Sequence, residues 1–188
     1  LVVTTIERRV STTAIENRAS RLISKFNHRQ KKRPEAVIRR SMTEMTGAGL
    51  IDADGDCQNT RAEILIRDSQ TKVSFDGCRV VGGLWKLPYS GGSTTSANQI
   101  DIDHIIPLKW AHGHGGDRWS DARKKAFAND PENLMATSSS ANRSKGAKGP
   151  DEWTTAINKC RYAPMRDGSI EKYGLVTTTE GYSPYGTL

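Results

Sequence analysis

The sequence of 188 residues is poor in cysteine and contains no long apolar run. Its three cysteines, Cys57, Cys78 and Cys160, are too few and too widely spaced for a zinc knuckle or a CxxC redox pair. Because no run approaches the ~18 to 20 apolar residues that a membrane span needs, we expect no membrane contact. With 35% apolar residues and no internal repeat, the chain predicts a single core with room for an appended arm.

The scarcity of cysteine leaves two interpretations of the thiols. A disulfide between Cys57 and Cys78 is sterically possible and would suit an exported protein, so we expect a secreted or extracellular location. The alternative is a cytoplasmic protein with three buried free thiols. The chain begins at Leu1 rather than Met, which fits a removed leader or a boundary within a longer protein.

Positive charge is concentrated at the start of the chain. The net charge is +7, yet residues 1–40 contain eleven Lys and Arg residues against three Glu, so the rest of the chain is nearly neutral. Helical spacing of apolar residues within this stretch predicts a basic helical arm over 1–50, followed by a second domain over 51–188. Such asymmetry indicates a polyanionic partner, most often nucleic acid, although a solvated helix face would give the same pattern.

Local patterns predict short elements after the arm. We expect a helix at 60–69 with Thr60 as its cap, although the central "ILI" would also suit a strand. The β-branched and aromatic content of 73–85 predicts a hairpin, and the Ser- and Gly-rich 90–98 predicts a flexible loop.

An acidic motif precedes the first of these helices. Asp52, Asp54 and Asp56, with Glu63 at the twelfth position, imitate the ligand spacing of an EF-hand calcium loop. Cys57, however, occupies the position where that loop requires glycine for its sharp turn. We therefore do not expect a calcium site of this kind.

The segment "QIDIDHIIPLKWAHGHGG" at 99–116 contains three of the four histidines. The alternation in "DIDHIIP" predicts a strand that ends at the proline and places Asp103 and His104 on opposite sides. His112 and His114 could join His104 in a zinc-binding module, but the flexible glycines around them and the lack of a cysteine pair argue against it.

Further elements follow this predicted strand in a suggestive order. We expect a helix at about 119–128, a strand at 133–137, and then a helix capped by Ser139 or Ser140. The order strand, strand, helix places a histidine and two asparagines on three successive elements. The candidate side chains are His104, Asn133 and Asn142, with Arg143 and Lys145 in the first turn of the last helix.

These pieces resemble the HNH endonucleases of the ββα-metal fold. "DIDHIIPL" matches the first strand, "PENLMAT" the second and "ANRSKG" the helix, as in the HNH domain of RNA-guided CRISPR nucleases. A longer resemblance, over about 52–175, is to the bacterial group related to the C-terminal domain of GmrSD-type restriction enzymes. The resemblance implies an α+β fold with an HNH core, additional helices and a β-hairpin.

Phosphodiester hydrolysis needs a base for water and a cation for the charge that develops on oxygen. His104, with an ordinary pKa near ~6.5, is the candidate general base. The resemblance implies that Asp103 and Asn142 bind one divalent metal, Mg²⁺ first and Mn²⁺ second. It also implies that Asn133 holds the His104 ring.

The same resemblance assigns contacts with substrate. Arg143 and Lys145 would hold phosphate oxygens by charge and by the dipole at the helix N-terminus, with Arg61 as a weaker candidate. We expect a metal-dependent endonuclease with little sequence specificity that acts on DNA, with RNA as a possible further substrate. A non-catalytic nucleic-acid-binding protein on an HNH scaffold is the alternative, but a degenerate scaffold should have lost one of these motif residues.

Overall fold

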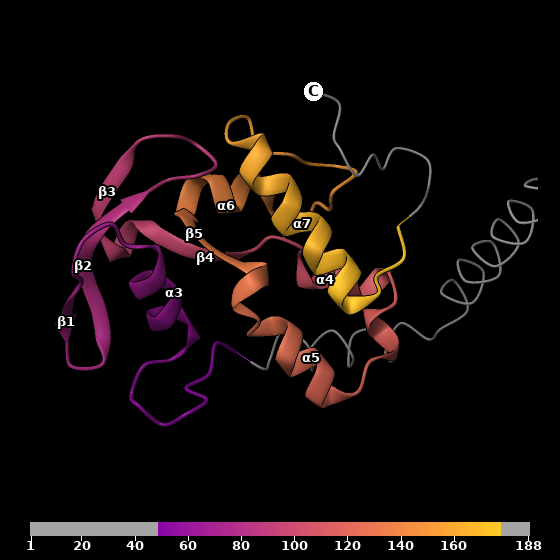
Figure 1. Ribbon diagram of the computed structural model, residues 1–188, viewed down its shortest axis with the longest axis horizontal. Coiled ribbons are helices and arrows are strands. Elements are labelled where there is room, and N and C mark those ends of the chain that lie inside the picture. The colour runs from indigo at the N-terminus through magenta and orange to yellow at the C-terminus, as the bar shows by residue number, and fades with distance from the viewer. Residues whose placement is uncertain (1–48, 178–188) are drawn as a thin grey trace, which may run out of the picture. The chain divides into compact units, whose positions relative to one another are not determined.

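The computed structural model describes residues 49–177, which combine helices with two small β-sheets (Figure 1). The predicted basic arm therefore lies outside the described residues, apart from its last two positions. Among the described helices, none is long and apolar enough to cross a membrane.

The first half of the described chain forms a helix and a small sheet. Helix α3 (Thr60–Asp68) is followed by strands β1 (Ser74–Asp76), β2 (Arg79–Lys86) and β3 (Ser93–Ser96). The three strands are antiparallel in the order β1-β2-β3. The predicted hairpin is confirmed, but the expected flexible loop at 90–98 contains β3, because pairing with β2 orders its Ser and Thr residues.

The second sheet has two antiparallel strands and leads directly into a helix. Strand β4 (Ile100–His104) pairs with β5 (Leu134–Ser138), with Ile100 opposite Ser138 and His104 opposite Leu134. Helix α6 (Ser139–Lys145) begins where β5 ends. The predicted order of two strands and a helix is therefore present, and the strands are joined by a long insert.

The insert and the C-terminal part supply the remaining helices. They are η1 (Ala97–Gln99), α4 (Leu108–Gly113), η2 (Gly116–Arg118), α5 (Asp121–Ala128), η3 (Pro131–Asn133) and α7 (Lys159–Tyr173). Figure 1 shows α7 as the longest ribbon of the described part, lying across the side of the molecule that also carries α4.

Polar caps fix where the helices begin, but twice one residue earlier than the sequence predicts. Asn59 caps α3 by accepting a hydrogen bond from the Ala62 amide, so Thr60 is the first helical residue rather than the cap. Ser138 caps α6 by accepting from the Ala141 amide, in place of the expected Ser139 or Ser140.

Three clusters of buried apolar residues hold these elements together. The first joins α3 and β2 to β4 and β5 around Trp85, whose fully buried indole donates a hydrogen bond to the Leu65 carbonyl at 2.7 Å. The second packs α4 and α5 against α7, and the third surrounds Tyr89 and Tyr162. The residues of the second cluster are Ile106, Trp110, Ala111, Phe127, Ile170, Tyr173 and Leu175. The two sides of β4 are thereby covered by separate parts of the core.

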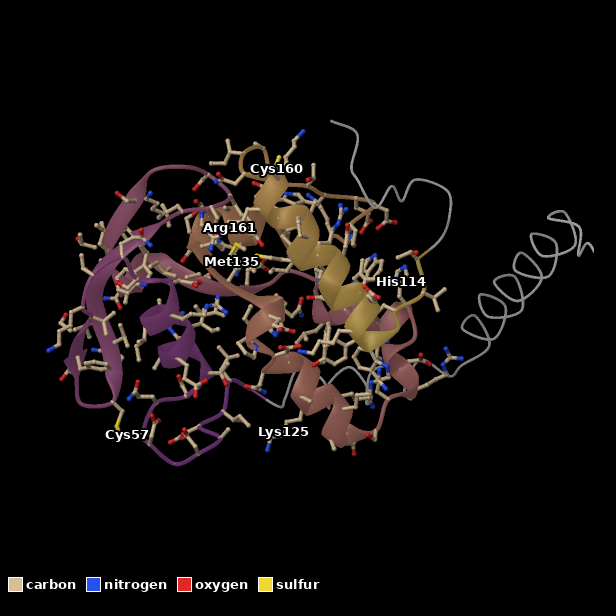
Figure 2. All side chains as sticks on the ribbon, viewed as in Figure 1. Cys57, His114, Lys125, Met135, Cys160 and Arg161 are labelled. Carbon is tan, nitrogen blue, oxygen red and sulfur yellow. A yellow bond between two sulfur atoms is a disulfide. The ribbon has the colours of Figure 1, made fainter. Side chains whose placement is uncertain are left out.

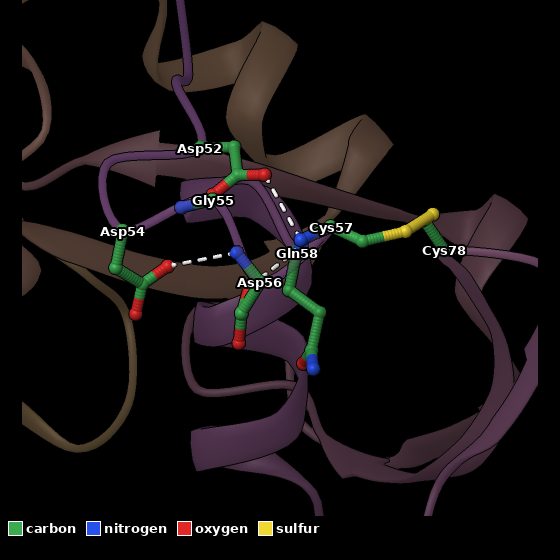
Figure 3. The surroundings of a disulfide bond; sticks show 7 residues. All are labelled: Asp52, Asp54, Gly55, Asp56, Cys57, Gln58 and Cys78. Carbon is green, nitrogen blue, oxygen red and sulfur yellow. Dashed lines mark hydrogen bonds between the residues drawn. A yellow bond between two sulfur atoms is a disulfide. The ribbon is translucent and has the colours of Figure 1, made fainter.

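The predicted disulfide between Cys57 and Cys78 is confirmed, with a Cα–Cα distance of 5.4 Å, and Cys160 is free and exposed. Figure 3 shows the acidic loop beside it. Asp52 accepts hydrogen bonds from the amides of Gly55 and Cys57, at 2.8 and 3.0 Å. The disulfide and these backbone contacts close the loop that leads into α3.

Candidate functional site

His104 is the last residue of β4, and one nitrogen of its ring is hydrogen-bonded to the backbone. The Nε2 atom lies 2.9 Å from the carbonyl oxygen of Ala128, the last residue of α5. Because a carbonyl can only accept, Nε2 carries the proton and Nδ1 is left with a free electron pair. Burial lowers the pKa of His104 below its usual value, which favours the neutral ring. The ring therefore has the tautomer that a general base requires.

Asn133 secures the chain that follows His104. Its side-chain oxygen accepts from the Ile106 amide at 2.8 Å, and its side-chain nitrogen donates to the Ile106 carbonyl at 3.1 Å. Its own carbonyl accepts from the Ile105 amide at 2.8 Å. The expected contact between Asn133 and the His104 ring is thus not the one that the structure shows, since Ala128 holds the ring and Asn133 fixes the backbone beside it.

Asp103 and Lys145 form a buried ion pair beneath β4. The side chains are 5% and 0% exposed, and the Lys145 nitrogen lies 2.9 Å from one Asp103 oxygen and 3.0 Å from the other. The Tyr89 hydroxyl donates to the same carboxylate at 2.7 Å, and Lys145 also donates to the His104 carbonyl at 2.7 Å. Burial raises the pKa of Asp103 and lowers that of Lys145, while their mutual attraction opposes both shifts.

Asn142, which was expected to bind one metal ion together with Asp103, is hydrogen-bonded to Asp101. The Asn142 side-chain nitrogen donates to one Asp101 oxygen at 3.1 Å, and the Ser139 hydroxyl donates to the other at 2.8 Å. Residues two apart on a strand share a face, so the carboxylates of Asp101 and Asp103 both face α6. The alternation in "DIDH" carried this signal, because it predicts that Asp101 accompanies Asp103.

The three residues that were predicted to contact phosphate differ in exposure and in the groups that they bind. Arg143 is exposed on α6, whereas Lys145 is fully buried, so the expectation that Lys145 touches phosphate is wrong for this arrangement. Both lie in the last turn of α6 rather than the first, where the helix dipole cannot help to bind an anion. Arg61 donates to the carbonyls of Ala97 and Ile100, which fixes the start of β4.

Within residues 49–177, Asp52, Asp54 and Asp56 are the only group in which three His, Cys, Asp or Glu side chains bring ligand atoms within 4.8 Å of one another. The histidines of the described chain do not form such a cluster. His114 stacks on Trp110 with ring centroids 3.6 Å apart, and His112 is buried on α4. The zinc-binding alternative therefore has no support in the described structure.

A family model for the C-terminal domain of GmrSD restriction endonucleases matches residues 58–173. The chain belongs to this family. The match spans β4, β5 and α6, and it confirms the resemblance seen in the sequence. The family takes its name from restriction endonucleases.

A curated relative from Arthroderma benhamiae, named an uncharacterized secreted protein, is 38% identical over 120 residues. The aligned part covers 61% of this chain and 58% of the relative, so the chain spans less than two thirds of that protein. No solved structure matches the chain.

As the predicted general base, His104 with its lowered pKa would give a hydrolytic activity of this chain a defined pH dependence. A general base works only when it is neutral, so the rate should fall as the pH drops through its pKa. Since burial lowers the pKa of His104, the midpoint of this acid limb should lie below about 6.5. The measurement is kcat/KM for cleavage of a DNA oligonucleotide against pH at fixed divalent cation, and a midpoint above that value would contradict it.

Proposed function

We propose that the protein is a metal-dependent endonuclease that hydrolyses DNA with little sequence preference. The observation that carries the proposal is the His104 ring, whose Nε2–H is donated to Ala128 and whose Nδ1 is left as a base. His104 ends β4, the strand whose Asp101 and Asp103 carboxylates face α6, and the side chain of Asn142 on α6 supplies a further oxygen atom.

In the proposed reaction, Nδ1 of His104 takes a proton from a water molecule. The water oxygen forms a bond to phosphorus, the bond from phosphorus to one ester oxygen breaks, and that oxygen leaves as an alcohol after it takes a proton from solvent. Asn133 keeps the base in place by holding the backbone of Ile105 and Ile106. A divalent cation, when bound, would offset the negative charge that develops on the phosphoryl and leaving oxygens.

The donor set of the β4–α6 face fits Mg²⁺ or Mn²⁺, which prefer oxygen ligands. Asn142 and Asp101 are adjacent and partly exposed, so both would hold the cation. Asp103 can join them only by giving up Lys145, because both of its oxygens now accept from that ammonium. We therefore add Asp101 to the expected ligands Asp103 and Asn142, and treat Lys145 as a competitor of the cation.

A secreted setting suits this activity. The disulfide between Cys57 and Cys78 is typical of proteins from oxidising compartments, and the relative from Arthroderma benhamiae is named as secreted. We infer that the protein acts outside the cell.

Supercoiled plasmid incubated with the full chain and Mg²⁺ should be nicked and then linearised, and EDTA should abolish this. Asp101→Asn and Asn142→Ala should each weaken Mn²⁺ binding at least ~10-fold, as measured by electron paramagnetic resonance of free Mn²⁺. The control is Asp54→Asn, which removes a carboxylate of the exposed acidic loop and should leave cleavage unchanged. Full cleavage by EDTA-treated protein, or unchanged Mn²⁺ affinity in Asp101→Asn, would contradict the proposed site.

A further inference from the structure

A groove of about 480 Å³ opens beside the proposed site, between α4 and the segment that follows α6. Its lining includes Lys109, Trp110, Arg143, Gly146, Lys148 and Glu152. Lys145, whose ammonium binds the Asp103 carboxylate, also lines the groove, which therefore adjoins the proposed cation site.

The groove carries more positive than negative charge. Lys109, Arg143 and Lys148 are exposed, whereas Glu152 is the only acidic residue of the lining. The Lys148 ammonium donates to the Ser144 carbonyl at 3.1 Å and keeps further protons for another acceptor. One Glu152 oxygen accepts from the Gly149 amide at 3.1 Å, which partly occupies that carboxylate. Such a lining attracts an anion.

The aromatic residue of the groove is not available for stacking on bases. Trp110 is 7% exposed, and its ring stacks on His114, which is labelled in Figure 2, with an angle of 10° between the planes. Gly149 lies so close to the indole that a Cβ atom at this position would overlap it. Sequence-tolerant binding of single strands commonly uses exposed aromatic rings, so this groove is suited to phosphates rather than bases.

We propose that this groove binds the phosphodiester backbone of the nucleic acid next to the bond that is cleaved. The inference rests on the proposed endonuclease function and adds Lys109 and Lys148 to the substrate contacts. Both would contact phosphate through charge alone, which explains how a substrate can be held without base readout. Glu152 opposes this attraction from inside the groove.

The test measures binding of a DNA duplex by fluorescence anisotropy, with the full chain carrying His104→Ala so that DNA is not cut. In this background, Lys109→Ala with Lys148→Ala should raise Kd at least ~10-fold and flatten the slope of log K against log salt by about 2. Glu152→Gln retains an acceptor for the Gly149 amide and should lower Kd. Lys72→Ala, which alters an exposed lysine outside the lining, is the control and should change neither quantity.

A second readout separates the groove from the chemistry. Bis(p-nitrophenyl) phosphate is a phosphodiester without an extended backbone, so in chains that keep His104 the groove substitutions should lower its hydrolysis far less than they lower the cleavage of DNA. His104→Ala alone should not hydrolyse it. Unchanged Kd and salt slope in the double variant would overturn the groove proposal alone, as would an equal loss on this small substrate. Hydrolysis by His104→Ala as fast as by the unaltered chain would overturn the proposed function instead.

Discussion

Replacing His104 with Ala is expected to lower plasmid cleavage at least ~10²-fold, while DNA affinity stays close to that of the unaltered chain. The variant loses the one nitrogen that can accept a proton from water, but it keeps Asn142, Asp101 and the exposed cations. Single-turnover cleavage rates and the Kd for DNA, measured on the same preparations, check both parts. Cleavage at the unaltered rate would exclude His104 as the base.

His104→Gln separates the loss of the base from the loss of a contact. A glutamine amide can still donate to the Ala128 carbonyl, which accepts from the histidine ring at 2.9 Å, but it has no basic nitrogen. The Gln variant should therefore be as inactive as the Ala variant and melt at a temperature closer to that of the unaltered chain. Activity in the Gln variant would mean that the ring acts only by holding α5 against β4.

Local sequence patterns were sufficient for the elements around the site. The alternation of β4 predicted a strand that ends at Pro107, and the structure ends it three residues earlier, at His104. The helix expected at 119–128 is α5, which begins at Asp121 because the Ser120 side chain caps it. Strand alternation and helix caps depend on residues that are close in sequence, so they can be predicted from the sequence alone.

Two larger features depend on contacts that no local pattern contains. The expected ligand Asp103 is paired with Lys145, 42 residues away, and only the packing of α6 on β4 brings the charges together. Helix α7 was not predicted, because Pro164 lies inside it and its apolar residues follow no clear stripe. Its residues Ile170 and Tyr173 are nevertheless buried against α4 and α5, so tertiary packing stabilises the helix.

The ion pair between Asp103 and Lys145 should be the most sensitive point for stability. Lys145→Met keeps most of the side-chain volume but removes the ammonium, so Asp103 remains buried without its counterion. Breaking a buried pair in this way typically costs about 3 to 5 kcal/mol. Urea unfolding should show that loss, with the control Arg79→Met, an exposed residue paired with the exposed Asp76, costing at most about 1 kcal/mol.

The stability lost in Lys145→Met should also depend on pH, and the ionisation of Asp103 determines whether it grows or shrinks as the pH rises. Burial raises the pKa of this carboxyl, and removing Lys145 raises it further, since the ammonium is what opposes the shift. A carboxyl whose folded pKa exceeds the unfolded value of about 3.9 destabilises the fold increasingly as the pH rises between those two values. The cost of Lys145→Met should therefore be smaller at about pH 4.5 than at about pH 7.5. Adding Asp103→Asn, which preserves an acceptor for Tyr89, should recover much of the stability and remove the pH dependence. If Lys145→Met alone is as stable as the unaltered chain at both pH values, Asp103 and Lys145 do not form a buried ion pair in solution.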